Sequence, residues 1–584
     1  MLHFISNSWG YYLCTLLLLL LFSCEKIKSG PDQEDWDHEV QFEIQGVQDV
    51  EEVPLLARKA STSAAPEMQQ PSKVMVHTDL VDMGGFDAVM SITEDVPTQF
   101  MGRGQPIRTA ERNRAATGQA VAARHITSLS PGSRYRIVLF KVGATPNDLT
   151  YVGQREGIVG GSAIRIGTYR NTQYRWYAYS FNNPAAIDTL TPSLGTVPIQ
   201  PTGGSPSSRQ DFAYATGVLT TGDVIGGVNK LQDIVLTRKT SRIIVEINGR
   251  GMFSGIHLAN PRFGNNAGLI RGNFRLSDSS YREINGDLGA NNSASNPHAD
   301  GYSVPIGQDS VRGLDFKRRY TFYTPADGVS SRELIVSIDE LHLRSSRVRE
   351  DNGVLEDRIR QFNGLTFRFP GFIPKAGKSY FVSIKLVESA ITIGTTQWAR
   401  HNVFRNATGP STEDGIKEYL FRYDNPLYHN HAASPPNDYF KNDIYSIVRG
   451  KNICELIYPE NTWDLPTPAD FQALEVLSGK RQPMQDNNWS MVITPTVSAA
   501  GAPGYPHGNL VFTPVGYKAR DGVGEPIQEY NPRSGFFAGT KGYWRTKTPA
   551  TFAQVNYSLF NTGMIDVENF PETRLANIRC VRKK

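Results

Sequence analysis

Residues 40–44, Val40-Gln41-Phe42-Glu43-Ile44, alternate apolar and polar side chains without a break. Side chains of a β-strand point to opposite faces in turn, so this alternation predicts a half-buried strand. The preceding residues are an apolar leader and then an acidic stretch, so we expect ordered structure to begin here. Runs of the same kind predict further strands at 135–140, 174–179, 234–236, 243–247, 320–323 and 380–386.

The composition agrees with a chain built mainly of strands. The 584 residues include 53 Gly, 35 Pro, 25 Tyr and 28 Phe, a mixture typical of short strands joined by tight turns. The length suggests about three or four domains. Charged residues make up 20% and the net charge is only +4, so the chain lacks the concentrated basic surface of a nucleic-acid binder. A mainly β fold with no nucleic-acid partner is therefore predicted.

Proline and glycine divide the chain into modules. The run Thr191 to Ser208 holds Pro and Gly at many positions, which predicts a break in regular structure and a domain boundary. From Ile391 onward the loops lengthen and a helix is predicted over Pro468 to Gly479. Thr467 is its expected N-cap, and one face carries Phe471, Leu474 and Leu477. The predicted domains after the leader are 40–195, 209–390 and 391–584.

The N-terminus has the pattern of a bacterial lipoprotein precursor. The apolar run Leu16 to Phe22 is followed directly by Ser23 and Cys24. A stable membrane span takes about 20 apolar residues, so the run is too short for one. We therefore predict a signal peptide at 1–23, a lipid on Cys24, an acidic tether at 24–39 and a location at the outer membrane. An ordinary cleaved signal and a retained membrane helix are the alternatives, because only His3 stands where Lys or Arg is usual.

Cysteine usage supports an extracytoplasmic location. Cys14 leaves with the leader and Cys24 carries the lipid, so the mature chain keeps only Cys454 and Cys580. Two remaining thiols outside the cytoplasm are expected to pair. The alternative is two free buried cysteines.

A search for catalytic or metal-binding sets gives one candidate. On a strand, His429 and His431 would share a face, as zinc ligands do, and Asp424 or Asp438 could add a third ligand. No nearby Cys or third His completes the set, so a solvated loop is favoured and no metal or other cofactor is predicted. No nucleophile and base can be paired either, so we predict a protein that is not an enzyme.

Several motifs, in a fixed order along the chain, resemble the fimbrillin-type subunits of Bacteroidales pili. The resemblance implies two tandem transthyretin-like β-sandwiches, export as a lipoprotein, and polymerisation by strand addition after an arginine-directed protease removes the first strand. The implied cut follows Arg58, for which an ordinary surface arginine is the alternative. The motifs are the lipobox, 40–44, Arg58-Lys59-Ala60, 167–169 with 174–179, 236–238 with 242–245, and 376–380.

The last third resembles a different module, the C-type-lectin-like domains of the Fibrobacter paralogous type. The resemblance includes one cysteine in the first half of the domain and one near its end, which match Cys454 and Cys580. It implies an α+β domain after the two sandwiches, as in an accessory or tip subunit rather than a stalk protein. The motifs that carry it are 398–402, 463–471, 542–546 and 577–582.

The expected function is therefore structural and adhesive. The chain is expected to be a subunit of a cell-surface fimbrium, at or near its tip, and to contribute to biofilm formation and virulence. Its expected partners are other fimbrial subunits, outer-membrane lipid through the acylated Cys24 with palmitate as an acyl group, and a host or bacterial surface protein or glycan. The alternative is an outer-membrane lipoprotein that binds glycan or peptide ligands outside any pilus.

Overall fold

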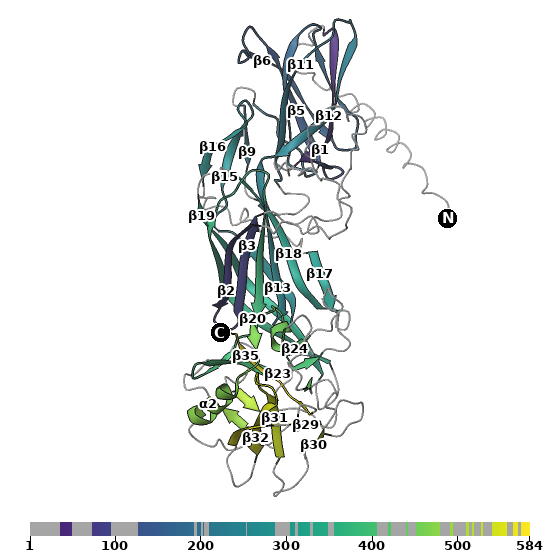
Figure 1. Cartoon of the computed structure of the whole chain (residues 1–584). Helices are drawn as coiled ribbons and strands as arrows, with labels where there is room; N and C mark the ends of the chain where they lie inside the picture. Colours follow the sequence, from purple (N-terminus) through teal and green to yellow (C-terminus); the bar gives the residue numbers. More distant parts are fainter. Residues whose placement is uncertain are drawn as a thin grey trace, which may run out of the picture.

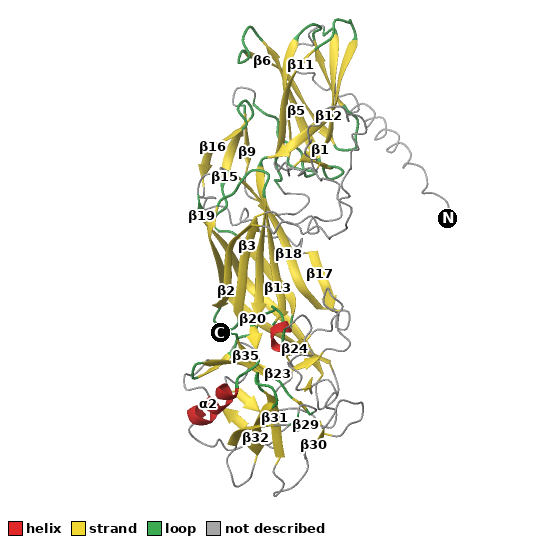
Figure 2. Ribbon diagram, viewed as in Figure 1, coloured by secondary structure: helices red, strands yellow, loops and turns green. Residues whose placement is uncertain are grey.

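The computed structural model is built mainly of β-strands, which confirms the predicted fold class (Figures 1 and 2). The chain forms an elongated molecule in which two β regions and a C-terminal head follow one another (Figure 1). The structure describes residues 36–48, 73–94, 126–191, 195–199, 202–203, 210–252, 254–264, 266–285, 304–309, 314–326, 331–348, 355–405, 419–421, 440–441, 451–478, 491–493, 510–512, 517–518, 527–528, 540–557, 564–569, 571 and 574–583.

In the first sandwich a single sheet curls round, so that its inner face encloses the core. The strand order is β4-β1-β12-β11-β8-β5-β6, and β7 also pairs with β1. Inward side chains from several strands pack together, including Phe42 on β1 and Trp176 on β8, whose ring centroids lie 6.5 Å apart. The strands are β1 (His38–Gln48), β4 (Ile126–Thr127), β5 (Arg134–Val142), β6 (Leu149–Ile158), β7 (Ile164–Thr168), β8 (Gln173–Ser180), β11 (Ala213–Thr220) and β12 (Gly227–Arg238).

A small sheet covers the outer face of the first sandwich. Tyr177 and Tyr214 point outward from β8 and β11 and pack with Phe274 of the small sheet. Phe274 and Tyr214 form an edge-on contact with centroids 5.0 Å apart. Its strands, in the order β16-β15-β9, are β9 (Thr196–Ile199), β15 (Arg271–Arg275) and β16 (Ser280–Asn285).

The second sandwich consists of two facing sheets. One has the order β10-β18-β13-β21-β3-β2, with β17 also on β18, and the other has the order β14-β19-β20. Their inner faces form the largest apolar cluster among the described residues. The strands are β2 (Lys73–Asp82), β3 (Asp87–Glu94), β10 (Thr202–Gly203), β13 (Thr240–Gly251), β14 (Gly255–Arg262), β17 (Val304–Asp309), β18 (Leu314–Pro325), β19 (Arg332–Val348), β20 (Leu355–Phe372) and β21 (Ser379–Val387).

The strand pairing departs from the predicted boundaries 40–195 and 209–390. Residues 73–94 form β2 and β3, and β3 pairs along its whole length with β21 of the second sandwich. Conversely, residues 213–238 form β11 and β12 of the first sandwich. The Pro- and Gly-rich run 191–208, predicted to break regular structure, contains the short strands β9 and β10. Local composition marks turns, but it carries no information on which sheet each strand joins.

The head begins at residue 391 and is built of short strands around α2. Thr467 caps this helix: its hydroxyl accepts a hydrogen bond from the Asp470 N–H at 3.2 Å, and its own N–H donates to the Asp470 carboxylate at 2.8 Å. Phe471 and Leu474 are buried, as predicted, and the Leu477 side chain lies outside the described residues. The elements are β22 (Ile391–Ile393), β23 (Thr396–Arg405), β24 (Tyr419–Phe421), β25 (Phe440–Lys441), η4 (Cys454–Leu456), β26 (Trp463–Asp464), α2 (Pro468–Ser478), β27 (Met491–Ile493), β28 (Leu510–Phe512), β29 (Tyr517–Lys518), β30 (Ile527–Gln528), β31 (Thr540–Arg545), β32 (Thr551–Tyr557), β33 (Met564–Asn569), β34 (Leu575–Ala576) and β35 (Arg579–Arg582).

The placement of β3 can be tested by a core substitution. Ile92 on β3 is fully buried in the second sandwich and lies opposite Val382 of β21. We expect Ile92→Ala to lower the local free energy of unfolding by about 2–5 kcal/mol through the cavity it leaves. Hydrogen exchange of the β21 amides measures this effect. The neighbouring, half-buried Thr93→Ala is the matched control, and unchanged exchange in Ile92→Ala would contradict the assignment of β3 to this sheet.

Candidate assembly strand and head joint

The first strand lies inside its sheet. β1 runs parallel to β12 on one side, from the pair His38 and Gly227 onward. On its other side it pairs antiparallel with β7 and, at its end, with β4. Val40 and Phe42 are fully buried, as their alternation predicts. All three partners of β1 come later in the chain, so β1 fills a slot formed entirely by downstream residues. We call the facing edges of β4, β7 and β12, with the core below them, the β1 slot.

Polar contacts fix the start of β1. The two ring nitrogens of His38 face the Val224 carbonyl at 3.2 Å and the Asn229 side-chain oxygen at 2.6 Å. The Asp37 carbonyl accepts a hydrogen bond from the Gly226 N–H at 2.7 Å. Its carboxylate also pairs with the Arg170 guanidinium at 3.2 Å. The strand is thus held at its first residue to the β11–β12 hairpin.

Leaving the β1 slot empty would cost a large free energy. Burying one large apolar side chain is worth about 1.5–3 kcal/mol, and β1 buries Val40, Phe42 and Val47. An empty slot would also leave two rows of unpaired backbone groups. A break in the chain after Gln48 would remove the covalent link between β1 and the rest of the sandwich. The hydrogen bonds and apolar contacts of β1 would remain. Its loss therefore requires another strand to take its place.

The second feature is the joint between the second sandwich and the head. One apolar cluster joins Val89 of β3 and Val387 of β21 to head residues, among them Trp463 and the two cysteines. Cys454 and Cys580 form the predicted disulfide, with an S–S distance of 2.03 Å and Cα atoms 5.8 Å apart. The disulfide therefore lies in the core that the head shares with the second sandwich.

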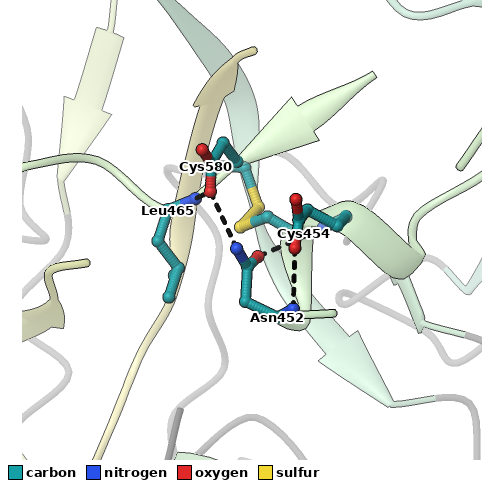
Figure 3. Close-up of a disulfide and its surroundings, with 6 residues drawn as sticks. Asn452, Cys454, Leu465 and Cys580 are labelled. Atoms are coloured by element: carbon teal, nitrogen blue, oxygen red, sulfur yellow. Dashed lines mark hydrogen bonds between the residues drawn. A yellow bond between two sulfur atoms is a disulfide. The ribbon is translucent and has the colours of Figure 1, made fainter. Parts of the chain in front are cut away.

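Asn452 organises the polar surroundings of the disulfide (Figure 3). Its side-chain amide donates to the Asp464 carboxylate at 2.7 Å, and the same carboxylate oxygen accepts from the Leu465 N–H at 2.8 Å. The Asn452 side-chain oxygen accepts from the Glu455 N–H at 3.2 Å. These bonds connect η4, which carries Cys454, to β26, which pairs with β35 and its Cys580.

Arg582 carries the ionic contact across the joint. Its guanidinium binds the Asp87 carboxylate at the start of β3 and the Glu388 carbonyl after β21. It also stacks over the Trp463 ring, 3.7 Å from the centroid. Nearby, the Asn248 side chain donates to the Tyr458 hydroxyl at 2.7 Å. The last strand of the chain is thereby fixed to strands of the second sandwich.

Burial determines the electrostatics of this pair. It raises the pKa of the Asp87 carboxyl, against the lowering effect of the Arg582 guanidinium. Burial also lowers the pKa of Arg582 to about 10, although Asp87 acts in the opposite direction. Both shifts mean that the two charges are held largely out of water. Such a pair fixes the geometry of the joint more than it adds net stability.

The predicted site residues have different outcomes. The disulfide of Cys454 and Cys580 is present, whereas Cys24, Arg58, His429 and His431 lie outside the described residues. The described residues contain no group of three or more His, Cys, Asp or Glu that could hold a metal. Within the same residues, no helix is long and apolar enough to cross a bilayer. Three tryptophans of the head, Trp398, Trp463 and Trp544, are fully buried.

Sequence reasoning missed Asp87 and Arg582. They are 495 residues apart. Arg582 ends the motif 577–582, but nothing in that motif distinguishes its side chain from a surface charge or identifies Asp87 as its partner. The one available signal was that Asp87 directly follows the apolar Phe86 at the start of a strand-like run. That signal does not identify a partner.

Comparisons with known proteins were made on sequence and on fold. No family model matches the chain, and no curated protein matches it. Among solved structures, a candidate cell adhesion protein of Bacteroides fragilis is 14% identical, with a TM-score of 0.25 over 54% of this chain and 91% of that chain. The fimbrial anchor protein of Porphyromonas gingivalis is 10% identical, with a TM-score of 0.21 over 42% and 94%. A fimbrilin of the same species is 8% identical, with a TM-score of 0.23 over 61% and 98%.

The disulfide can be tested in the full chain, because the head shares its core with the second sandwich. Cross-linking residues 126 apart restricts the unfolded chain and is worth about 5 kcal/mol in the chain-entropy model. We expect the double variant Cys454→Ser, Cys580→Ser to lower the melting temperature of the head under oxidising conditions. Adding reductant to the native chain should reproduce the shift and leave the double variant unchanged. Equal melting of both chains would remove the disulfide as a source of stability.

The ion pair can be tested by a double-mutant cycle. Arg582→Met leaves the Asp87 carboxylate buried without its partner, which we expect to destabilise the joint by about 3–5 kcal/mol. The double variant Asp87→Leu, Arg582→Met should cost clearly less than the sum of Asp87→Leu and Arg582→Met measured singly. The adjacent, half-exposed Lys583→Met is the control and should have little effect. Strict additivity of the two single changes, measured by thermal unfolding, would contradict a coupled pair.

Proposed function

We propose that this chain is a structural and adhesive subunit of a cell-surface fimbrium, made as a lipid-anchored precursor. The observation that carries the proposal is the β1 slot. Its occupant is an N-terminal strand flanked on both sides by strands from later in the chain. A strand from a neighbouring subunit with the same apolar and polar alternation can satisfy this slot, which is the physical basis of strand addition.

We propose that processing after Arg58 prepares the slot for this exchange. Residues 49–72 connect β1 to β2, so a cut there leaves β1 bound by non-covalent contacts alone. The next strands, β2 and β3, belong to the second sandwich and remain attached to it after such a cut. The mature subunit would therefore lose one strand while its second sandwich and head stay intact.

The way β35 is held supports a place at or near the tip. β35 lies between β23 and β26, Cys580 cross-links it, and Arg582 pairs with Asp87. A strand held in this way is not available for donation to a neighbouring subunit. The proposed head, of C-type-lectin-like type, would then project from the fimbrium and bind a host or bacterial surface protein or glycan. It would thereby contribute to biofilm formation.

The proposal is tested by following the chain into purified fimbriae. We expect fimbriae to contain the chain trimmed after Arg58, with immunogold label near their tips. Arg58→Ala should keep the chain intact and reduce its incorporation, because β1 stays covalently joined to the slot. Arg108→Ala is the matched control and should be incorporated normally. Normal incorporation of untrimmed Arg58→Ala chains would contradict strand exchange at this position.

Lipid anchoring is tested separately. Cys24→Ala should abolish labelling of the precursor with radioactive palmitate and release it from the membrane. An intact, lipid-labelled chain that is found only in the outer membrane and never in fimbriae would favour the alternative function, a surface lipoprotein that binds glycan or peptide ligands.

A further inference from the structure

The hairpin between β11 and β12 exposes apolar side chains at its turn. Val224 and Ile225 are the two most exposed large apolar residues among those described, with 64% and 70% of their surface in water. Val228 in the first residues of β12 is 40% exposed. Val224 and Ile225 thus form a small contiguous apolar surface at the turn, which is available for contact with an apolar partner. We call residues 221–228 the apex loop.

The apex loop lies at the end of the first sandwich that is remote from the head (Figure 1). β12 has 12 residues and extends from the apex loop to Arg238, where the chain passes directly into β13 of the second sandwich. At about 3.3 Å per residue, the loop is about 35 Å along the strand from that junction. The head is attached to the opposite end of the second sandwich through Arg582 and the shared core.

The start of the described chain lies against this loop. The Asp37 carbonyl accepts from the Gly226 N–H, and His38 contacts the Val224 carbonyl. Trp36 precedes them, packs over Gly167 and keeps 39% of its surface exposed. Tryptophan is enriched at membrane–water interfaces, where its amphipathic ring lies at the level of the headgroups. The apex loop and Trp36 therefore lie together at one end of the molecule.

The N-terminal segment limits how far this end can move from the lipid anchor. Eleven residues separate Cys24 from Trp36, which span about 40 Å at most when fully extended. An acyl group on Cys24 therefore keeps the apex loop near the bilayer at a high effective concentration. A tethered protein can therefore form weak apolar contacts with the bilayer that would be too weak to bind a free protein.

We infer that the apex loop inserts Val224 and Ile225 into the lipid surface to which the chain is anchored, so that the head points away from the membrane. The inference rests on the proposed lipid anchor at Cys24. Asp223 next to the apolar pair is exposed, so the loop would lie at the level of the lipid headgroups. Membrane contact at this end and a rigid joint at the other give the precursor a defined orientation.

The test places an environment-sensitive fluorophore on the loop. Residues 1–24 are replaced by a hexahistidine tag, which holds the chain on phosphatidylcholine vesicles that contain a nickel-chelating lipid. The remaining cysteines, Cys454 and Cys580, are paired, so Ile225→Cys supplies a single thiol for the label. We expect a blue shift of the emission on anchoring and quenching by brominated lipids. Adding Val224→Asp should remove both effects.

The matched control carries the label at Ile359→Cys on β20, a residue that is 48% exposed in the second sandwich. Its emission should not change on anchoring. An Ile225→Cys label that behaves like the Ile359→Cys label would overturn the inference. Because the nickel anchor replaces the acyl group, this result is independent of whether Cys24 is acylated in cells, which the palmitate experiment reads separately.

Discussion

The structure depends on one constraint: an interior strand needs hydrogen-bond partners along both of its edges. Every backbone N–H and C=O that is buried between two neighbouring strands needs a partner, and an empty place in a sheet leaves two such rows unpaired. Both ends of the described chain occupy interior places: β1 between β12 and β7, and β35 between β23 and β26. The two strands differ in what else holds them. β35 carries a disulfide and a buried arginine, whereas β1 is held by packing, hydrogen bonds and an exposed ion pair between Glu39 and Arg165. β1 is therefore the strand that the proposed exchange would replace.

The path of the chain makes the molecule a continuous rod. β2 and β3 leave the first sandwich and complete a sheet of the second, while β11 and β12 return to the first before β13 continues into the second. β3 then presents Asp87 to Arg582 at the far end. The buried Arg238 and Asp211 ion pair stabilises the turn where β12 ends. The chain passes between the two sandwiches more than once, and a buried charge pair joins the second sandwich to the head. The modules are therefore coupled through several contacts rather than through a single linker.

The sequence predicted local features well and long-range ones poorly. Alternation of apolar and polar residues correctly placed strands at Val40–Ile44, 135–140, 174–179 and 380–386, because that pattern follows directly from the pleat. The cap of α2 by Thr467 and the pairing of the last two cysteines likewise depend on few residues. Which sheet β3 joins depends on the competing edges of the whole chain, and β21 lies almost 300 residues later. The Asp87 and Arg582 contact has the same origin, so no local pattern could have revealed it.

The positions of the slot, the apex loop and the head have a consequence for the order of events. The contacts of His38 and Asp37 with the hairpin belong to the same strand that fills the slot. Loss of β1 would therefore remove Trp36 and the proposed lipid anchor, and it would also release the hairpin from the side chain that holds its turn. Under the proposed acylation of Cys24, membrane attachment and occupancy of the slot would depend on the same strand. Under the proposed acylation of Cys24 and cleavage after Arg58, a subunit could leave the membrane only by exchanging its own β1 for a strand from a neighbour.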